Sequence, residues 1–225
     1  MLDLYTWATP NGHRVSIMLE ELGASYVAHS VDLDAGAQFD PAFLALSPNN
    51  KIPVLVDSDA PGAPRVLFES GAILIYLAEK SGRFLAPGGP ERDKALEWLF
   101  WATTALGPMF GQFGHFAWIR EDKIIATIEH FTMESIRLMG VLERRLAETE
   151  YLAGDYSIAD IAAFSWVKSI AHPLRDRVGA RLAPIPNTDR WLTAVGARPG
   201  VMRGQRVPKA VLRSGETHPP AMATP

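Results

Sequence analysis

Cysteine is absent from all 225 residues of the sequence. The absence excludes disulfide cross-links, thiolate metal ligands and any nucleophilic or redox-active thiol supplied by the protein itself. Six histidines are present, but none shows the H-E-x-x-H spacing of a zinc protease, which disfavours a catalytic zinc site. We therefore expect chemistry that uses neither a bound metal nor a protein thiol.

An excess of positive charge is also missing. The sequence has 22 Lys and Arg against 25 Asp and Glu, a formal net charge of -3, so we expect no broad basic surface for a nucleic acid. No run approaches the roughly 20 apolar residues of a membrane span, and no basic segment followed by an apolar stretch opens the chain. We expect a soluble cytoplasmic protein with small-molecule partners and neither nucleic acid nor membrane.

Two common catalytic motifs are lacking as well. The sequence contains neither a G-x-S-x-G nucleophile elbow nor a phosphate-binding P-loop, so hydrolase and kinase activities lose support. The glycines of segment 107–116 have the wrong spacing for a dinucleotide fingerprint. This segment, rich in Gly and Phe, is typical of a loop or helix break whose aromatics belong to the core or line an apolar pocket.

The first 84 residues carry alternating strand and helix patterns. Period-2 alternation and β-prone runs predict strands, whereas apolar residues at helical spacing that end at glycines predict helices. The pattern gives strands at 2–6, 26–32, 53–57 and 65–68, and helices at 15–22, 41–47 and 70–82. The predicted order is βαβ followed by ββα, in an α/β domain of residues 1–84.

Strand patterns disappear after the breaker-rich quartet 87–90, which is typical of a linker. Helical periodicity then predicts helices at 91–106, 124–147, 157–174 and 188–197, in an all-α domain of residues 91–212. Ser157-Ile158-Ala159-Asp160 is a capping-box pattern that we assign to folding. Residues 213–225 are small, polar and proline-rich, which predicts a disordered tail.

Ile52-Pro53 stands where a strand of the first domain should begin. If the bond is cis, Ile52 presents its N–H and C=O to a ligand backbone instead of a neighbouring strand, an interaction resembling strand addition. The alternative is an ordinary trans proline that starts a strand, because only about 5–6% of X-Pro bonds are cis. The dipeptide alone does not decide between them.

Glu69-Ser70 lies between a predicted strand and a predicted helix start. The helix N-terminus favours a carboxylate, which Ser70 and its N–H can hold, while Glu69 can accept from an ammonium group. Together the pair can bind the α-amino acid end of a ligand. The alternative, about equally favoured, is that Ser70 is simply the N-cap of the helix.

Thr9 and Asn11 occupy the first strand-to-helix turn. A thiol bound there would meet hydrogen-bond donors and the positive end of the helix dipole, both of which favour thiolate. The alternative is that either residue caps the helix, with Pro10 in the first turn. Taken singly, the cap is the commoner use.

The order and separation of these motifs resemble the glutathione transferase superfamily over nearly the whole chain. Four blocks are, more narrowly, similar to its bacterial nu class: Thr9-Pro10-Asn11-Gly12-His13, Ser47-Pro48-Asn49-Asn50-Lys51-Ile52-Pro53, Phe68-Glu69-Ser70-Gly71-Ala72-Ile73-Leu74 and Trp98-Leu99-Phe100-Trp101. The resemblance implies a thioredoxin-like domain that binds glutathione, followed by an all-α domain.

The resemblance also implies roles for individual residues. It implies a cis Pro53, with the Ile52 backbone on the cysteinyl part of glutathione and Glu69-Ser70 on the γ-glutamyl end. Gln38 and Lys51 would reach the remaining polar groups. In this class Thr9 and Asn11, in place of a catalytic Tyr, Ser or Cys, contact the glutathione sulfur.

The resemblance to the nu class further implies a homodimer. Each site would accept two glutathione molecules, or glutathione disulfide, and reduce small disulfides. In a chain without cysteine, such a role must use only the thiols of bound glutathione. In the family an arginine meets a glutathione carboxylate across the dimer, where this chain has His130. We therefore expect the affinity for glutathione to be weaker or more dependent on pH.

The resulting hypothesis is a glutathione-dependent disulfide reductase, with peroxide reduction as an added activity. Thr9 and Asn11 stabilise the reacting sulfur, and Phe113, His115 and Phe116 form a wall of the second-substrate pocket. One alternative is transfer of glutathione to apolar electrophiles. Another is a non-catalytic glutathione-binding protein, because a fold does not determine a function.

Overall fold

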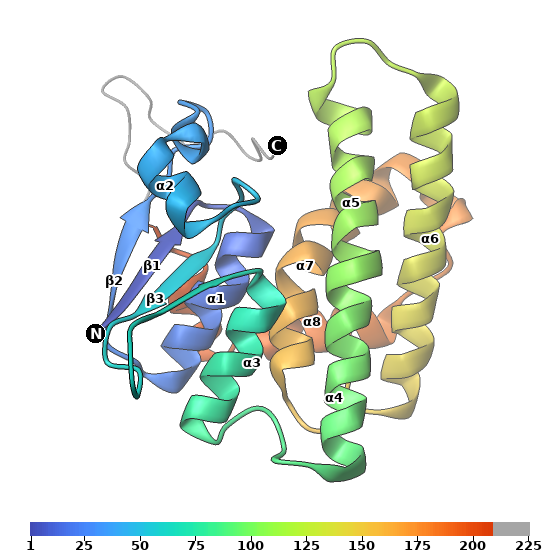
Figure 1. Cartoon of the computed structure of the whole chain (residues 1–225). Helices are drawn as coiled ribbons and strands as arrows, with labels where there is room; N and C mark the ends of the chain where they lie inside the picture. The colour runs from blue at the N-terminus through green and yellow to red at the C-terminus, as the bar shows by residue number, and fades with distance from the viewer. Residues whose placement is uncertain (209–225) are drawn as a thin grey trace. The chain divides into compact units, whose positions relative to one another are not determined.

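The computed structural model describes residues 1–208, so the predicted tail at 213–225 lies outside the described residues. The chain forms two compact units (Figure 1). The first contains Met1–Arg83 together with the described residues from Arg198 onward, and the second contains Phe84–Ala197. None of the described helices combines the length and the apolar character needed to cross a bilayer.

The first unit is built on a sheet whose strands are ordered β2-β1-β3-β4. The strands are β1 (Leu2–Thr6), β2 (Tyr26–Ser30), β3 (Val54–Asp57) and β4 (Arg65–Phe68). β1 runs parallel to β2, whereas β3 is antiparallel to both β1 and β4. The predicted βαβ-ββα order and thioredoxin-like fold are confirmed.

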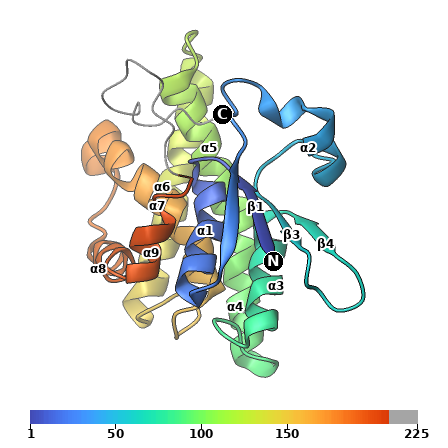
Figure 2. The ribbon, with the colours of Figure 1, turned by 90° about the vertical axis from the view of Figure 1, so that its left-hand side faces the viewer.

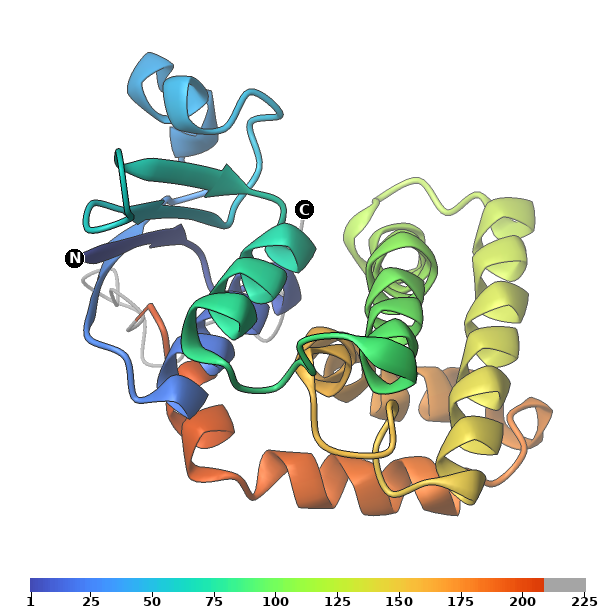
Figure 3. The same cartoon turned by 60° about the horizontal axis from the view of Figure 1, so that its bottom comes forward.

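Helices cover both faces of this sheet. α1 (Pro10–Leu22) and α3 (Ser70–Ser81) lie on one face, and η1 (Ala37–Phe39) and α2 (Pro41–Leu46) lie on the other (Figure 3). α1 begins at the Thr9 N-cap and ends at Gly23, whose φ of 65° suits glycine. Val15 and Met18 of its inner face are fully buried.

The short helix α9 (Pro199–Gly204) packs along α1 (Figure 2). Gly204 permits the contact, because a Cβ there would lie only 2.4 Å from the Ile17 Cα. Arg198 binds the buried Glu21 carboxylate at 2.7 Å. The described residues 198–208 therefore belong with the first unit, whereas the sequence interpretation placed them in the all-α domain.

The second unit is helical throughout its regular elements. They are α4 (Gly89–Trp101), η2 (Ala102–Leu106), α5 (Gly107–Gly114), η3 (His115–Ile119), α6 (Ile125–Glu148), α7 (Ile158–Val178), η4 (Gly179–Arg181) and α8 (Pro186–Gly196). α5 contacts both α6 and α7. The predicted all-α character of this part of the chain is confirmed.

The expected loop or break at 107–116 is wrong, because helical turns continue from Gly89 to Ile119. The π-helical turn η2 directly precedes Pro108, so the regular α-helical hydrogen-bond pattern is already interrupted where the proline lacks an N–H. Gly111 brings α5 against the ring of Trp166, since a Cβ would lie 3.2 Å from it. Phe110 is fully buried, so tertiary packing overrides the helix breakers.

Candidate functional site

Three candidate segments lie at the same end of the sheet, where strands β1, β3 and β4 begin or finish. Tyr5 of β1 is the register partner of Val54 of β3, and Val54 is the partner of Phe68 of β4. The turn containing Thr9 follows β1, Ile52-Pro53 precedes β3, and Glu69-Ser70 follows β4. The sheet topology thus brings together residues that the sequence spreads over about sixty positions.

Thr9 is the N-cap of α1, as the capping alternative predicted. Its buried Oγ1 accepts a hydrogen bond from the Gly12 N–H at 3.3 Å. A hydroxyl carries one proton as well as two lone pairs, so a capping Thr9 still has a proton to donate to a ligand. Gly12 lets the turn lie against β1, because a Cβ would come within 2.2 Å of the Trp7 carbonyl oxygen.

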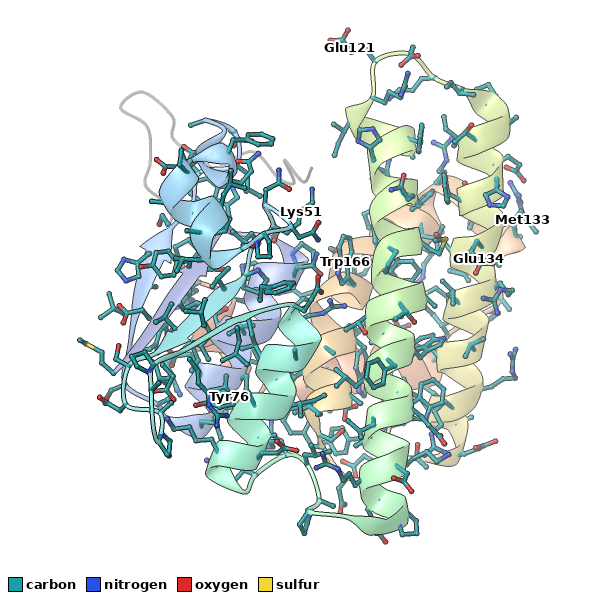
Figure 4. The ribbon with its side chains drawn as sticks, viewed as in Figure 1. Lys51, Tyr76, Glu121, Met133, Glu134 and Trp166 are labelled. Carbon is teal, nitrogen blue, oxygen red and sulfur yellow. The ribbon has the colours of Figure 1, made fainter. Side chains whose placement is uncertain are left out.

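The Ile52-Pro53 bond is cis, as the resemblance implied. Both residues are buried, and strand pairing begins only at Val54, so the Ile52 peptide lies outside the ladder. Ser47 fixes the preceding loop: its hydroxyl donates to the Lys51 carbonyl at 2.9 Å and accepts from the Lys51 N–H at 3.3 Å. The Lys51 side chain is exposed on this loop (Figure 4).

Glu69 occupies the N-cap position of α3, and its side chain makes no capping hydrogen bond. The alternative that Ser70 is the N-cap is therefore wrong. Glu69 has φ 69° and ψ 114°, a conformation that costs a non-glycine residue about 1–3 kcal/mol. Ser70 is buried, and the exposed Glu69 carboxylate stands beside it. A strained residue at an uncapped helix start is typical of a binding site.

Arg14 is a residue of this site that the sequence interpretation missed. The residue is 3% exposed, and its Nη1 donates to Asn11 Oδ1 at 2.9 Å and to Ser70 Oγ at 3.2 Å. Burial lowers the pKa of Arg14 to about 10, and the charge of Glu69 opposes that shift. The available signal was helical spacing, since Asn11, Arg14 and Met18 recur on one face of α1.

Gln38 lies in η1, which follows β2 at the same end of the sheet. Its Oε1 is enclosed and has no hydrogen-bond partner within residues 1–208. Buried polar atoms are nearly always paired, so an unpaired one in a candidate site suits a ligand that donates to it. The observation fits the role that the resemblance implies for Gln38.

The other predicted site residues belong to the second unit. Phe116 of η3 stacks on Phe131 of α6 with ring centroids 5.6 Å apart. His115 packs edge-on against Phe116, and His130 packs edge-on against Phe131. These four rings form a continuous aromatic row, in which His115 and Phe116 are partly exposed and His130 is exposed.

Phe113 does not join that row. Its ring has no exposed surface and packs against Trp118 with centroids 4.8 Å apart. The predicted place of Phe113 in a pocket wall is at odds with this burial, because α5 turns the ring into the helical core. No cluster of three or more His, Asp or Glu side chains in the described part of the chain is arranged to hold a metal ion.

Comparison with known proteins bears directly on this arrangement. The family model "Glutathione S-transferase, N-terminal domain" matches residues 1–79. The chain is 46% identical to the disulfide-bond oxidoreductase YfcG of Escherichia coli over 94% of its own length and 97% of that protein.

The chain belongs to the glutathione transferase family.

A second relative of this glutathione transferase is YghU of Escherichia coli, also named a disulfide-bond oxidoreductase. The identity is 41%, over 92% of this chain and 74% of that protein. The predicted superfamily is thereby confirmed.

Solved glutathione transferases show the same fold with ligands bound. One from Pseudomonas putida, with one glutathione disulfide per subunit, aligns with a TM-score of 0.87 and 44% identity, covering 92% of this chain and 91% of that one. One from Burkholderia graminis, with two glutathione molecules per subunit, aligns with a TM-score of 0.86 and 45% identity, covering 92% and 88%. The roles of individual residues in this glutathione transferase stay predictions.

Proposed function

We propose that this glutathione transferase reduces small disulfides by thiol–disulfide exchange through bound glutathione. The observation that carries the proposal is that Thr9, Ile52 and Ser70 lie at the same end of the sheet in a chain without cysteine. The two relatives named disulfide-bond oxidoreductases support the reaction type. The protein contributes position and charge stabilisation, and the reacting thiols come from glutathione.

The binding roles follow the chemistry of the tripeptide. The Ile52 backbone, outside the strand ladder, pairs with the cysteinyl backbone. The Glu69 carboxylate accepts from the α-ammonium group, while Ser70 and the N-terminus of α3 bind the α-carboxylate. Gln38 and Lys51 bind the remaining polar groups.

The reaction needs two glutathione thiols. The first thiolate attacks one sulfur of the substrate disulfide, forms a mixed disulfide and expels the other sulfur as a thiolate that takes up a proton. The second glutathione thiolate attacks the glutathione sulfur of the mixed disulfide, forms glutathione disulfide and releases the second product thiol. Two glutathione molecules thus supply the two electrons. The solved relatives with two glutathiones or glutathione disulfide per subunit support this stoichiometry.

Thr9 and Asn11 lower the cost of forming the attacking thiolate. The Thr9 hydroxyl donates its proton to the sulfur while its oxygen still accepts from Gly12. Asn11 adds an amide donor, and the N-terminus of α1 adds the positive end of its dipole. Each interaction favours the charged form of the sulfur.

A turnover assay with a model disulfide and reduced glutathione tests the proposal. Thr9→Ala combined with Asn11→Ala is expected to lower kcat/KM by about 10- to 100-fold, through loss of donors to the developing thiolate. Ser157→Ala removes a cap of another helix and is the matched control. Unchanged turnover in the double variant would contradict the roles of Thr9 and Asn11.

Glutathione transfer to apolar electrophiles is a second candidate. It is favoured by the partly exposed aromatic row of His115, Phe116, Phe131 and His130, which suits an apolar second substrate. Turnover of an aryl halide, measured beside that of a disulfide and a peroxide, separates the activities. Binding without any turnover would instead favour a non-catalytic glutathione-binding protein.

We propose further that the protein is a homodimer. β4 is an edge strand with Val66 and Phe68 48% and 40% exposed, and Phe100 on α4 is 55% exposed. Apolar residues on an edge strand are usually covered in the native assembly. Sedimentation equilibrium tests the proposal, and a monomer at micromolar concentration would contradict it.

His130 is proposed to meet a glutathione carboxylate of the partner protomer. Histidine lacks the bidentate guanidinium fork that arginine offers to a carboxylate, so this contact is expected to be weaker than the one an arginine would make. His130→Arg should therefore strengthen glutathione binding, as calorimetry can show.

The cytoplasm keeps thiols reduced, so it is the compartment that suits an enzyme consuming reduced glutathione.

A further inference from the structure

A buried cation connects the two halves of the proposed glutathione site. Arg14 is 3% exposed, and a single nitrogen of its guanidinium, Nη1, contacts both Asn11 and Ser70. Asn11 is proposed to serve the glutathione sulfur, and Ser70 to serve the γ-glutamyl end.

The contact with Asn11 determines which end of its amide can serve a sulfur. Arg14 carries only donors, so it must be met by the carbonyl oxygen of Asn11, Oδ1, at 2.9 Å. The amide nitrogen, Nδ2, then points away from Arg14 on the other side of the planar amide group. A thiolate is an acceptor, so the orientation set by Arg14 presents the end of Asn11 that a thiolate requires.

The contact with Ser70 works in the same way. Nη1 donates to Ser70 Oγ at 3.2 Å, which leaves the serine hydroxyl proton directed to another acceptor. A glutathione carboxylate at the N-terminus of α3 is such an acceptor. Arg14 therefore orients a donor at each end of the tripeptide.

The charge of Arg14 adds a second effect. Burial lowers its pKa only to about 10, so the guanidinium stays charged at neutral pH. A buried charge is screened less than an exposed one, which extends its influence on a nearby thiolate. The neighbouring Glu69 carboxylate is the opposing charge.

We propose that Arg14 is a positioning residue for the reaction: it orients Asn11 toward the glutathione sulfur and Ser70 toward the γ-glutamyl carboxylate. The proposal rests on the proposed function. Arg14 touches neither reacting atom. It acts mainly through the two side chains that it bridges, and its charge adds to that effect.

The test compares Arg14→Met and Arg14→Lys with the wild type, using reduced glutathione as the probe. The readouts are the pKa of the bound thiol, followed by thiolate absorbance against pH, and the dissociation constant from calorimetry. Arg198→Met is the matched control, because it removes a part-buried arginine of the same unit that pairs with Glu21. A purely structural role would lower stability in Arg14→Met and Arg198→Met alike and leave the thiol pKa unchanged.

Arg14→Met is expected to raise the pKa of the bound thiol by about one unit, a tenfold loss of thiolate at pH values below it. Affinity should weaken by about tenfold, since the Ser70 orientation is also lost. Arg14→Lys keeps the charge without the planar fork, so its thiol pKa should fall between those of the wild type and Arg14→Met. In the Asn11→Ala background, Arg14→Met should change the thiol pKa less than in the wild type, because only the effect of the charge remains to be lost.

A bound thiol pKa in Arg14→Met equal to that of the wild type overturns the proposal. If Arg14→Met fails to fold, an unchanged thiol pKa in Arg14→Lys overturns it as well. A wild type that does not depress the glutathione thiol pKa at all would remove the proposed function together with this role. If the wild type and every Arg14 variant depress the pKa of the bound glutathione thiol by the same amount, only the role of Arg14 is removed.

Discussion

Two helices of this protein begin with a buried serine, and their N-termini are built in opposite ways. α7 starts after Ser157 and α3 starts at Ser70. In the sequence both look like ordinary helix starts, with a small polar residue ahead of an apolar run. The contacts around the two serines separate a folding device from a candidate binding site.

The start of α7 is closed on itself. Ser157 Oγ accepts from the Ala159 N–H at 3.2 Å. The Asp160 carboxylate accepts from the N–H groups of Ser157 and Leu152, both at 3.0 Å, and from the indole N–H of Trp191 at 2.8 Å. The predicted capping box is confirmed, and its acceptors are occupied by protein donors.

The start of α3 is open by comparison. Glu69 is held at φ 69° without a capping hydrogen bond, and Ser70 Oγ accepts from Arg14, a residue of another helix. Backbone strain and a buried cation here replace the self-contained cap. The difference teaches that a helix start which satisfies its own donors serves folding, whereas one held open by outside groups suits a ligand.

The largest expected effect comes from disrupting the start of α7, whose hydrogen-bond donors are satisfied by its own residues. Asp160→Ala leaves three buried N–H donors without their acceptor, and each such group costs about 1–3 kcal/mol. We expect a loss of about 3–5 kcal/mol in the free energy of unfolding, as for the breaking of a buried hydrogen-bond network. Denaturant titration of the whole chain measures it.

The same variant carries a pH signature. Burial raises the pKa of Asp160 to about 6 from 3.8, against the effect of its hydrogen-bond donors. The native state then binds more protons than the unfolded state, so the contribution is fully present below pH 3.8 and is lost as pH rises through about 6. The destabilisation caused by Asp160→Ala should shrink over this window, and a constant value would contradict the raised pKa.

Replacing each of the two serines by alanine sharpens the comparison. Ser70→Ala is expected to weaken glutathione binding about tenfold, or about 1.4 kcal/mol, because a carboxylate loses a donor. Ser157→Ala should leave affinity unchanged and cost about 1 kcal/mol of stability through loss of the cap. Calorimetry with glutathione and denaturant titration of both variants give the two values. Equal affinity losses would show that the two helix starts do not differ in function.

The smallest expected effect is a gain in stability. Glu69→Gly removes the Cβ that makes φ 69° unfavourable, so unfolding should cost about 0.5–1 kcal/mol more. The same change removes the carboxylate proposed to bind the glutathione ammonium group, so affinity should fall. Glu69→Ala keeps the strain and is the control. A loss of stability in Glu69→Gly would show that Glu69 is not strained.

Local residue chemistry made much of this fold predictable. Gly23 and Gly82 end α1 and α3 at left-handed positions, and the alternating strands have the predicted order. The capping box was readable for the same reason, since Ser157 and Asp160 are three residues apart. The segment around Gly111 was not, because the contact with Trp166 that keeps it helical comes from a distant helix.

The candidate site was predictable in its parts and not in its connections. Thr9, Ile52 and Ser70 stand at element boundaries, which local patterns reveal. Arg14 looks like an ordinary charged residue of an amphipathic helix, and only the folded chain shows it bridging Asn11 and Ser70. The burial of Phe113 was hidden likewise, because a phenylalanine in an aromatic-rich segment suits a core and a pocket equally well.

The packing of α9 on α1 has a consequence for how the protein is made. Ser16 Oγ donates to the Gly204 carbonyl at 2.7 Å across 188 residues of sequence. At a synthesis rate of about 5–20 residues per second, α1 waits roughly 10–40 seconds on the ribosome before its partner helix is translated. During that interval the face of α1 that α9 covers is left for chaperones or solvent, and the glutathione-binding unit becomes complete only after the whole helical unit has been synthesised.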